Sequence, residues 1–252
     1  QITHPIFKEV LKKIQNRSLP IHFSTKSSLA SGSGLASSSA FTVALLDVVN
    51  SLNGQNNTPI ELAQEAIRIE REVLGESGGW QDQYFASHSG VQAMEFFNSK
   101  CRVQNIQCNA WNDSLKSRLF LVPTNKTRRA HQIESSKTMD RVSFDELSSL
   151  AQKGAELFLK DNVDLREMGR LIDQGWKIKK SLSSEVSDAD IDHTVKLIKN
   201  KGAYGVKICG AGGGGMLAVL AERDVMKQLY KMYGMPYVQI SIETNGITRR
   251  EF

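Results

Sequence analysis

Residues 32–40 read Gly-Ser-Gly-Leu-Ala-Ser-Ser-Ser-Ala and stand directly before an apolar helical pattern that runs from Ala36 to Leu52. Small residues at a helix start let backbone N–H groups approach an anion closely, and the helix dipole favours negative charge there. No Lys-Ser/Thr pair follows the glycines, so this is not a Walker A loop, and Ser37 stands where a dinucleotide fingerprint has its third glycine. The stretch predicts a phosphate-binding loop. A flexible serine-glycine connection that caps a core helix is the alternative.

A second small-residue loop, Gly210–Gly215, contains five glycines in six residues and lies between two apolar stretches, 205–208 and 216–220. Ordering so many glycines costs conformational entropy, so the loop implies backbone torsions or close approaches that side chains would prevent. A tight turn between two strands, the alternative, needs only one or two glycines.

Two carboxylates follow the first loop. Glu70 lies in a helix expected over residues 60–74, and Asp82 comes after the glycine-rich turn Gly75–Gly79, in a segment with neither a helical nor a strand period. One carboxylate in such a pair can hold Mg²⁺ while the other orients or deprotonates an attacking hydroxyl. A solvated helix face is the alternative for Glu70, because its neighbours are charged.

The remaining pattern predicts an α+β fold, because a run of strands follows the first helices and helices fill the second half. Further helices are expected at 5–17, 143–160, 164–182, 188–200 and 222–233. The first begins with Pro5, and the second opens with a capping-box pattern from Ser143 to Glu146. The further strands are expected at 21–25, 91–98, 102–108, 117–123 and 236–242. Domains are predicted at residues 1–113 and 114–252.

Composition excludes several classes. The 252 residues carry a formal net charge of +5, which mildly favours anionic ligands, but Lys and Arg are scattered and do not form a nucleic-acid-binding stripe. Three cysteines without a C-x-x-C pair predict neither a disulfide framework nor a zinc site, and fit a reducing, cytoplasmic compartment. No apolar run is long enough for a membrane span. The chain begins at Gln1, so an N-terminal portion is expected to be missing.

The three signals, in this order, resemble the GHMP kinase family (galacto-, homoserine, mevalonate and phosphomevalonate kinases). The family's P-x-x-x-G-L-G-S-S-A/S motif resembles Ala30–Ser39, with Ala30 replacing the proline and Ala36 the middle glycine. Its C-terminal glycine loop resembles Lys207–Gly215, and its catalytic-aspartate turn resembles Gly79–Gln83. The family's first motif and its cation near the aspartate are absent. Within the family the heptose 7-phosphate kinase branch is the most similar, and fucokinases share Gly-Gly-Trp-Gln-Asp-Gln.

The resemblance implies a two-lobed GHMP fold, with ATP and the sugar in the cleft between the lobes. It implies ATP and Mg²⁺ as cofactors, Asp82 as the catalytic residue, and Ser38 and Glu70 as metal ligands. The ATP-binding residues would be Gly32, Ser33, Gly34, Leu35, Ala36, Ser37, Ser38 and Ser39. The acceptor-binding residues would be Gln81, Gly212, Gly213, Gly214 and Arg128, with Lys126 as a further phosphate contact.

The expected reaction is ATP-dependent phosphorylation of a sugar or sugar phosphate, with a heptose 7-phosphate phosphorylated at its anomeric position as the first candidate. A fucokinase-like sugar 1-kinase and a non-catalytic relative that binds a sugar phosphate or nucleotide are the alternatives. The expected partner is a small molecule, not a nucleic acid or a membrane, and a homodimer is left open.

Overall fold

The computed structural model describes residues 4–16, 20–27, 32–98, 100–106, 113–127, 130–160, 162–240 and 247–248. The chain divides into two compact units. The first unit comprises residues 1–31, 36–103 and 243–252, and the second comprises residues 32–35 and 104–242. The domain boundary expected between residues 113 and 114 stays a prediction.

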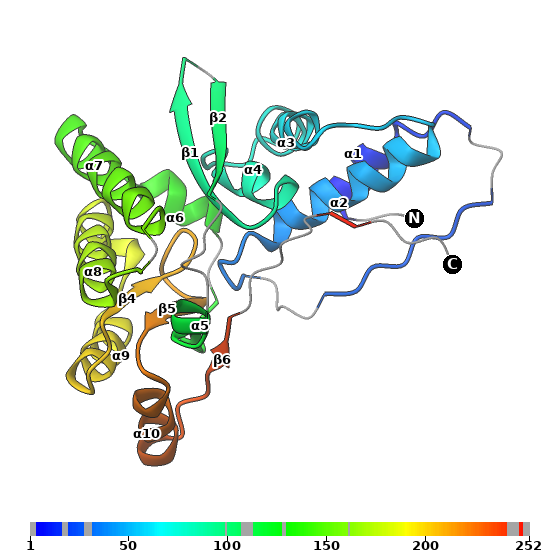
Figure 1. Ribbon diagram of the computed structural model, residues 1–252. Helices are drawn as coiled ribbons and strands as arrows, with labels where there is room; N and C mark the ends of the chain where they lie inside the picture. Colours follow the sequence, from blue (N-terminus) through cyan, green and yellow to red (C-terminus); the bar gives the residue numbers. More distant parts are fainter. Residues whose placement is uncertain are drawn as a thin grey trace. The chain divides into compact units, whose positions relative to one another are not determined.

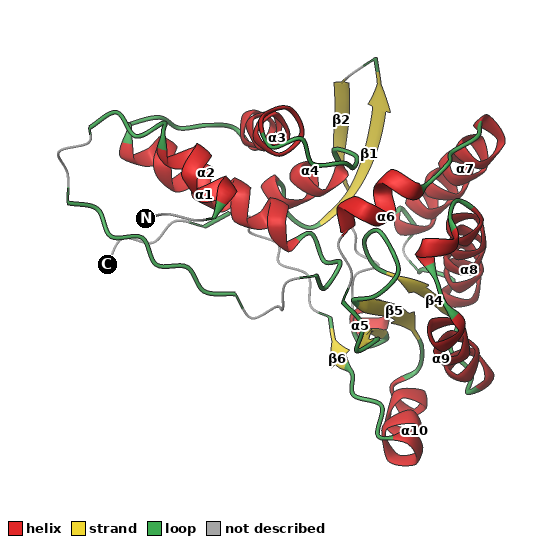
Figure 2. Cartoon of the chain, turned by 180° about the vertical axis from the view of Figure 1, so that it is seen from behind, coloured by secondary structure: helices red, strands yellow, loops and turns green. Residues whose placement is uncertain are grey.

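The first unit is mainly helical, and Figures 1 and 2 both show α1 and α2 side by side. A two-stranded sheet, β1 with β2, follows the helices. The core packs apolar side chains of α1, α2 and α3, among them Val10, Leu46 and Leu62. The elements are α1 (Pro5–Leu11), α2 (Ser37–Leu52), α3 (Pro59–Ile67), the π-helical segment η1 (Arg68–Val73), α4 (Gln81–Ser87), β1 (Val91–Phe97) and β2 (Lys100–Ile106).

Helix α1 ends earlier than its sequence pattern predicts, at Leu11 instead of residue 17. The side chain of Asn53 accounts for the end. Its Oδ1 accepts a hydrogen bond from the Gln15 N–H at 3.1 Å, and its Nδ2 donates to the Lys13 carbonyl at 2.9 Å. Backbone groups that a longer helix would pair internally are therefore satisfied by a residue at the end of α2.

The strand expected at residues 21–25 does not form. Residues 20–27 pair with none of the described strands. Phe23 packs edge-on against Phe7 of α1 instead, with ring centroids 5.6 Å apart. This segment is held by an aromatic contact to the helical core and not by a β-ladder.

The expected helix over residues 60–74 forms, but its second half is π-helical from Arg68 to Val73. The Leu74 N–H donates to the Ile69 carbonyl at 3.0 Å, an i→i−5 hydrogen bond. Ile69 and Glu70 are adjacent in sequence and both are buried, each 1% exposed. The π-helical turn thus lies where two consecutive side chains, one apolar and one a carboxylate, are both buried. Such turns are frequent at functional sites.

The second unit is built on an antiparallel sheet with the strand order β4-β5-β3-β6. Helices α8 and α9 lie beside β4 in Figures 1 and 2. The sheet strands are β3 (Leu119–Pro123), β4 (Gly205–Ile208), β5 (Met216–Leu220) and β6 (Val238–Gln239). The helices are α5 (Asp113–Lys116), α6 (Ala130–Ser136), α7 (Arg141–Phe158), α8 (Leu165–Ser181), the short η3 (Ser184–Val186), α9 (Ala189–Asn200) and α10 (Arg223–Tyr233). The predicted α+β class is therefore confirmed.

Strand alternation sets the core of this unit. Phe120 and Val122 of β3 are buried while their neighbours along the strand are half-buried, which is the period-2 pattern of a sheet with one buried face. Side chains from the helices complete this core, including Trp176 of α8, Ile198 of α9 and Met226 of α10.

Three details of the second unit differ from expectation. Helix α7 begins at Arg141, because Asp140 caps it by accepting a hydrogen bond from the Ser143 N–H at 2.7 Å, so the predicted capping box at Ser143 is wrong. Of residues 236–240, the described part of the strand predicted at 236–242, only Val238 and Gln239 form β6. Helix α6 was not predicted.

Among the described residues, no helix combines the length and apolar composition that crossing a bilayer requires.

Helix α8 crosses β4 through two glycines. A Cβ on Gly169 would lie 2.2 Å from the Tyr204 carbonyl oxygen, and one on Gly205 would lie 2.6 Å from the Gly169 carbonyl oxygen. Backbone packs directly on backbone here, so neither position has room for a methyl group.

We predict that Gly169→Ala destabilises the protein by about 2–3 kcal/mol, because the added methyl overlaps a backbone that cannot move without displacing β4. The matched control is Gly175→Ala on the same helix, where an added Cβ meets nothing within 4 Å. That change is expected to stabilise by about 0.5–1 kcal/mol through helix propensity. Urea unfolding of both variants measures the difference, and equal midpoints would contradict the proposed crossing.

Candidate functional site

The two glycine-containing loops of the sequence pack directly on each other. A Cβ on Gly34 would lie 2.7 Å from the Cys209 carbonyl oxygen, and a Cβ on Gly210 would lie 2.7 Å from the Gly34 Cα. Both glycines have positive φ, +75° and +61°. A side chain at either position would therefore suffer both a clash and backbone strain.

Ser33 and Gly215 extend this contact. The Met216 N–H donates to the Ser33 carbonyl at 3.1 Å, and a Cβ on Gly215 would lie 2.5 Å from the same oxygen. Ser33 is 4% exposed, and its hydroxyl has no hydrogen-bond partner in the part of the chain that the structure describes. The first half of the predicted phosphate loop, residues 32–35, thus lies on the C-terminal glycine loop in the second unit.

The rest of the C-terminal loop is held from its other side. The Gly213 N–H donates to the Val186 carbonyl at 2.7 Å, and the Gly215 N–H donates to the Lys126 carbonyl at 2.8 Å. A Cβ on Gly212 or Gly214 would lie within 2.8 Å of a carbonyl oxygen of these same two residues. Of the three glycines predicted to contact the acceptor, Gly212 and Gly214 are therefore also required by packing, and Gly213 has a positive φ of +68°.

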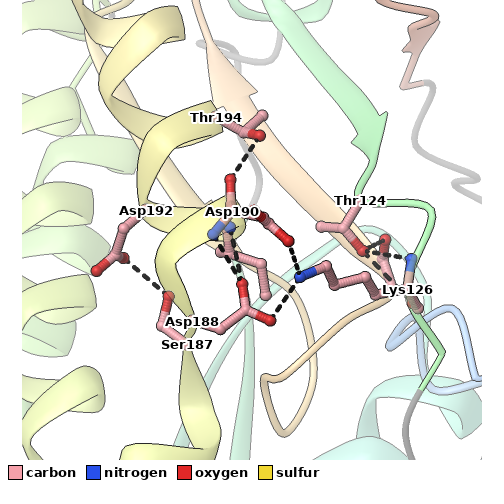
Figure 3. Close-up of polar contacts among 9 residues, drawn as sticks. Thr124, Lys126, Ser187, Asp188, Asp190, Asp192 and Thr194 are labelled. Carbon is pink, nitrogen blue, oxygen red and sulfur yellow. Dashed lines mark hydrogen bonds and ion pairs between the residues drawn. The ribbon is translucent and has the colours of Figure 1, made fainter.

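Lys126 forms an ion-pair cluster at the start of α9 (Figure 3). Its Nζ donates to Asp188 Oδ2 at 2.7 Å and to Asp190 Oδ2 at 2.6 Å. The two hydrogen bonds raise the pKa of Lys126, and the bond from Lys126 holds the pKa of Asp188 below its usual value. Asp188 also caps α9 by accepting from the Asp190 and Ile191 N–H groups. With two carboxylates on it, Lys126 is poorly suited to binding a phosphate. Arg128 lies outside the described residues.

Glu70 is the centre of a buried polar cluster in the first unit. Its Oε2 accepts from Ser39 Oγ at 3.0 Å and from Gln83 Nε2 at 2.5 Å, and its Oε1 accepts from Thr42 Oγ1 at 2.6 Å. The three donors come from α2 and α4, so the helix starts of both elements lie against η1. A buried carboxylate with three donors is fixed in orientation and is not the solvated helix-face residue of the alternative reading.

The oxygen atoms around Glu70 suit a magnesium ion in kind. Thr42 Oγ1, which donates to Glu70, is also 3.1 Å from the Ser38 carbonyl, so the first turn of α2 is close to the carboxylate. The Ser38 side chain is exposed. Within the described ranges no three His, Cys, Asp or Glu residues gather. One carboxylate plus hydroxyls fits Mg²⁺, which keeps several waters and takes further oxygens from substrate phosphates.

Asp82 lies in the first turn of α4 and not in an irregular loop, which corrects the expectation for this segment. It is half-buried, and its neighbour Gln83 is fully buried and donates to Glu70. The exposed Gln81 begins the helix. The carboxylates at 70 and 82 therefore belong to one connected piece of structure in the first unit.

Sequence reasoning missed Arg71 as a cation of this region. Its guanidinium donates to the Gly79 carbonyl through Nε at 3.2 Å and Nη2 at 2.9 Å, and Nη2 is 3.9 Å from Glu70 Oε2. It thus joins η1 to the turn before Asp82. The family's cation near the aspartate was thought to be absent, and the charged run around Glu70 was the only signal for this one. Thr42 and Gln83 were missed because nothing in their spacing points to Glu70.

Ala36 precedes α2 in the left-handed conformation, with φ +55° and ψ +27°. The family motif has glycine here. An alanine in this region is strained by roughly 1–2 kcal/mol relative to a right-handed conformation, because Cβ approaches the following carbonyl oxygen.

We therefore predict that Ala36→Gly stabilises the protein by about 0.5–1 kcal/mol, the relief of strain exceeding the entropy that glycine adds to the unfolded chain. The control is Ala40→Gly, four residues on in the exposed part of α2, which is expected to destabilise by about 1 kcal/mol. Thermal unfolding of both variants gives the comparison. Destabilisation by both would mean that residue 36 is not left-handed.

Family models match both halves of the chain. Residues 5–90 match the GHMP kinases N terminal domain, and residues 156–233 match the GHMP kinases C terminal domain. A D-glycero-alpha-D-manno-heptose 7-phosphate kinase from Campylobacter jejuni is 32% identical over 249 residues, which cover 93% of this chain and 71% of that protein. A bifunctional fucokinase/GDP-fucose pyrophosphorylase from Arabidopsis thaliana is 29% identical over 76% of this chain and 19% of its own length.

Solved structures show the same fold. A D-glycero-D-manno-heptose 1-phosphate kinase from Bacteroides thetaiotaomicron superimposes with a TM-score of 0.71 at 24% identity, covering 96% of this chain and 72% of that one. A putative sugar kinase from Campylobacter jejuni gives 0.67 at 28% identity, covering 86% and 65%. On the family matches and the 32% identity, the chain belongs to the GHMP kinase family.

Proposed function

We propose that this chain transfers the γ-phosphate of ATP to the anomeric hydroxyl of a heptose 7-phosphate. The observation that carries the proposal is the buried Glu70 carboxylate, which accepts hydrogen bonds from Ser39 and Thr42 of α2 and from Gln83, the residue that follows Asp82 in α4. The substrate comes from the relative that is 32% identical and is named a heptose 7-phosphate kinase.

The residues divide into three roles. Backbone N–H groups of the loop Gly32–Ser39 bind the ATP phosphates. Ser38 and Glu70 hold Mg²⁺, which when bound neutralises charge on the phosphates. Asp82 accepts or orients the proton of the attacking hydroxyl, and Gln81, Gly212–Gly214 and Arg128 are proposed contacts of the acceptor. Phosphoryl transfer depends mainly on positioning and charge stabilisation, which a rigidly held carboxylate serves.

A fucokinase-like activity is the second candidate. It is favoured by the stretch Gly-Gly-Trp-Gln-Asp-Gln at residues 78–83 and by two fucokinase-containing relatives that are each 29% identical.

An ATP-consumption assay with D-glycero-D-manno-heptose 7-phosphate, the unphosphorylated heptose, L-fucose and D-galactose tests the proposal. We expect turnover with the heptose 7-phosphate at a kcat/KM at least tenfold above the others, and ³¹P NMR of the product to show a phosphate on the anomeric carbon. Preferred turnover of L-fucose would replace the first candidate by the second. No turnover of any of these sugars would contradict both candidates.

We predict that Asp82→Asn lowers kcat on the order of 10²-fold or more while the Kd of ATP stays within about threefold, because the amide cannot accept the hydroxyl proton. Glu72→Gln is the control, since Glu72 is an exposed carboxylate on η1. Steady-state kinetics and equilibrium ATP binding give the two quantities. A wild-type kcat in Asp82→Asn would remove this residue from the mechanism.

A further inference from the structure

Three lysines of the second unit gather where the C-terminal glycine loop leaves β4. Lys179, in the last turn of α8, is half-buried and donates from Nζ to the Gly210 carbonyl. Lys207 lies on β4 and Lys137 follows α6, and both are half-buried. The N–H of Thr138, the residue after Lys137, donates to the Leu182 carbonyl at the end of α8 at 2.9 Å, and α8 packs against β4, so both lysines lie near Lys179.

The positive charge of this cluster is poorly compensated. Lys137 pairs with Glu134 at 2.5 Å, but among the residues that the structure describes Lys179 and Lys207 form no ion pair with a carboxylate. Other half-buried lysines of the same unit do find one: Lys199 pairs with Asp173 at 2.5 Å, and Lys126 pairs with two aspartates. Three ammonium groups therefore share one carboxylate.

Burial and the two neighbouring cations lower the pKa of Lys179 from its ordinary value to about 8. Cys209 offers no countercharge, because burial raises the pKa of its thiol. Trp176, three residues before Lys179 and so on the same helix face, is buried, and its indole Nε1 has no hydrogen-bond partner within the described ranges. Lysine ammonium groups without a carboxylate partner are what an anionic ligand would satisfy.

We propose that Lys179, Lys207 and Lys137 bind the phosphate group of a sugar-phosphate acceptor. The proposal rests on the proposed function, and it gives that acceptor's existing phosphate a site in the second unit. A phosphate monoester is close to a dianion at neutral pH, and cationic side chains supply the charge that backbone N–H groups alone do not. Lys179 also contacts Gly210, which packs on Gly34, so the cluster borders the two glycine loops.

The three lysines could instead bind the phosphates of ATP. Comparing the KM for heptose 7-phosphate with the KM for ATP distinguishes these two ligands. Lys179→Met and Lys207→Met remove the charge and keep most of the side-chain length. We expect each to raise the KM for heptose 7-phosphate at least tenfold, with the KM for ATP and the activity on unphosphorylated heptose within twofold of wild type. The control is Lys177→Met, an exposed lysine on the same helix.

Direct binding separates failure of this site from failure of the proposed function. Isothermal titration with heptose 7-phosphate in the absence of ATP needs no turnover, and it should show at least tenfold weaker binding to Lys179→Met than to Lys177→Met. Equal binding to both variants would overturn the proposal, as would a rise in the KM for ATP alone. Wild-type protein that binds heptose 7-phosphate but does not phosphorylate it would refute only the proposed function.

The pH dependence of heptose 7-phosphate binding gives an independent test of the role of Lys179. Because Lys179 is protonated below a pKa of about 8, heptose 7-phosphate binding should weaken as pH rises from 7 to 9, through loss of one positive charge. The charged or titratable groups that face Lys179 are Lys207, Lys137, Glu134 and Cys209, and burial raises the pKa of the Cys209 thiol. Lys179→Met should show an affinity independent of pH between 7 and 9. The same slope in the variant would contradict the assignment.

Discussion

The position of residues 32–35 on the C-terminal glycine loop depends on one contact, between Gly34 and the backbone of Cys209 and Gly210. Backbone packs directly on backbone there, without side chains in between. Gly215 repeats the contact against the Ser33 carbonyl, and the Met216 N–H adds a hydrogen bond to it. Because such contacts tolerate no Cβ, they fix the separation of the two loops more narrowly than side-chain packing does. Residues 32–35 are therefore an ordered part of the second unit and not a free serine-glycine linker, which was the alternative reading of the sequence.

The hydrogen bonds that hold the C-terminal glycine loop explain why Lys126, predicted as a phosphate contact, is better understood as a structural residue. Lys126 presents its carbonyl to Gly215 and its ammonium to Asp188, the residue that caps α9. Its ammonium group is therefore already paired at the start of α9, and its carbonyl holds the glycine loop. Lys179 has the opposite situation: it is near two like charges, and in the described part of the chain it forms no ion pair with a carboxylate. Lys126 is therefore a structural cation, whereas the charge of Lys179 is available to a ligand. The difference comes from the partners of each lysine and not from the residue type.

Sequence patterns could predict the elements whose periodicity is long and internally consistent, such as α2, α8, α9, β4 and β5. They could not predict features set by single tertiary contacts: Asn53 ends α1, Asp140 starts α7, and the short helix α4 forms where Gln83 and Tyr84 are buried. The glycine loops, Glu70 and Asp82 could be proposed as site residues because their composition or family spacing is unusual. Thr42, Gln83 and Arg71 were not, because ordinary residue types acquire their role only once α2, η1 and α4 are packed together.

The Glu70 cluster shows how such a site holds charge in the interior. The carboxylate is 1% exposed, and three of its contacts are neutral hydroxyl or amide donors, while the cation Arg71 is 3.9 Å away. Hydrogen bonds offset part of the desolvation cost of the carboxylate, but neutral donors leave its net charge in place. Replacing them by a close bidentate arginine would make the carboxylate cheaper to bury and would also remove its attraction for a divalent cation. The long Arg71 contact is therefore consistent with a carboxylate kept oriented but not neutralised, which is the electrostatic condition that a magnesium-dependent phosphoryl transfer requires.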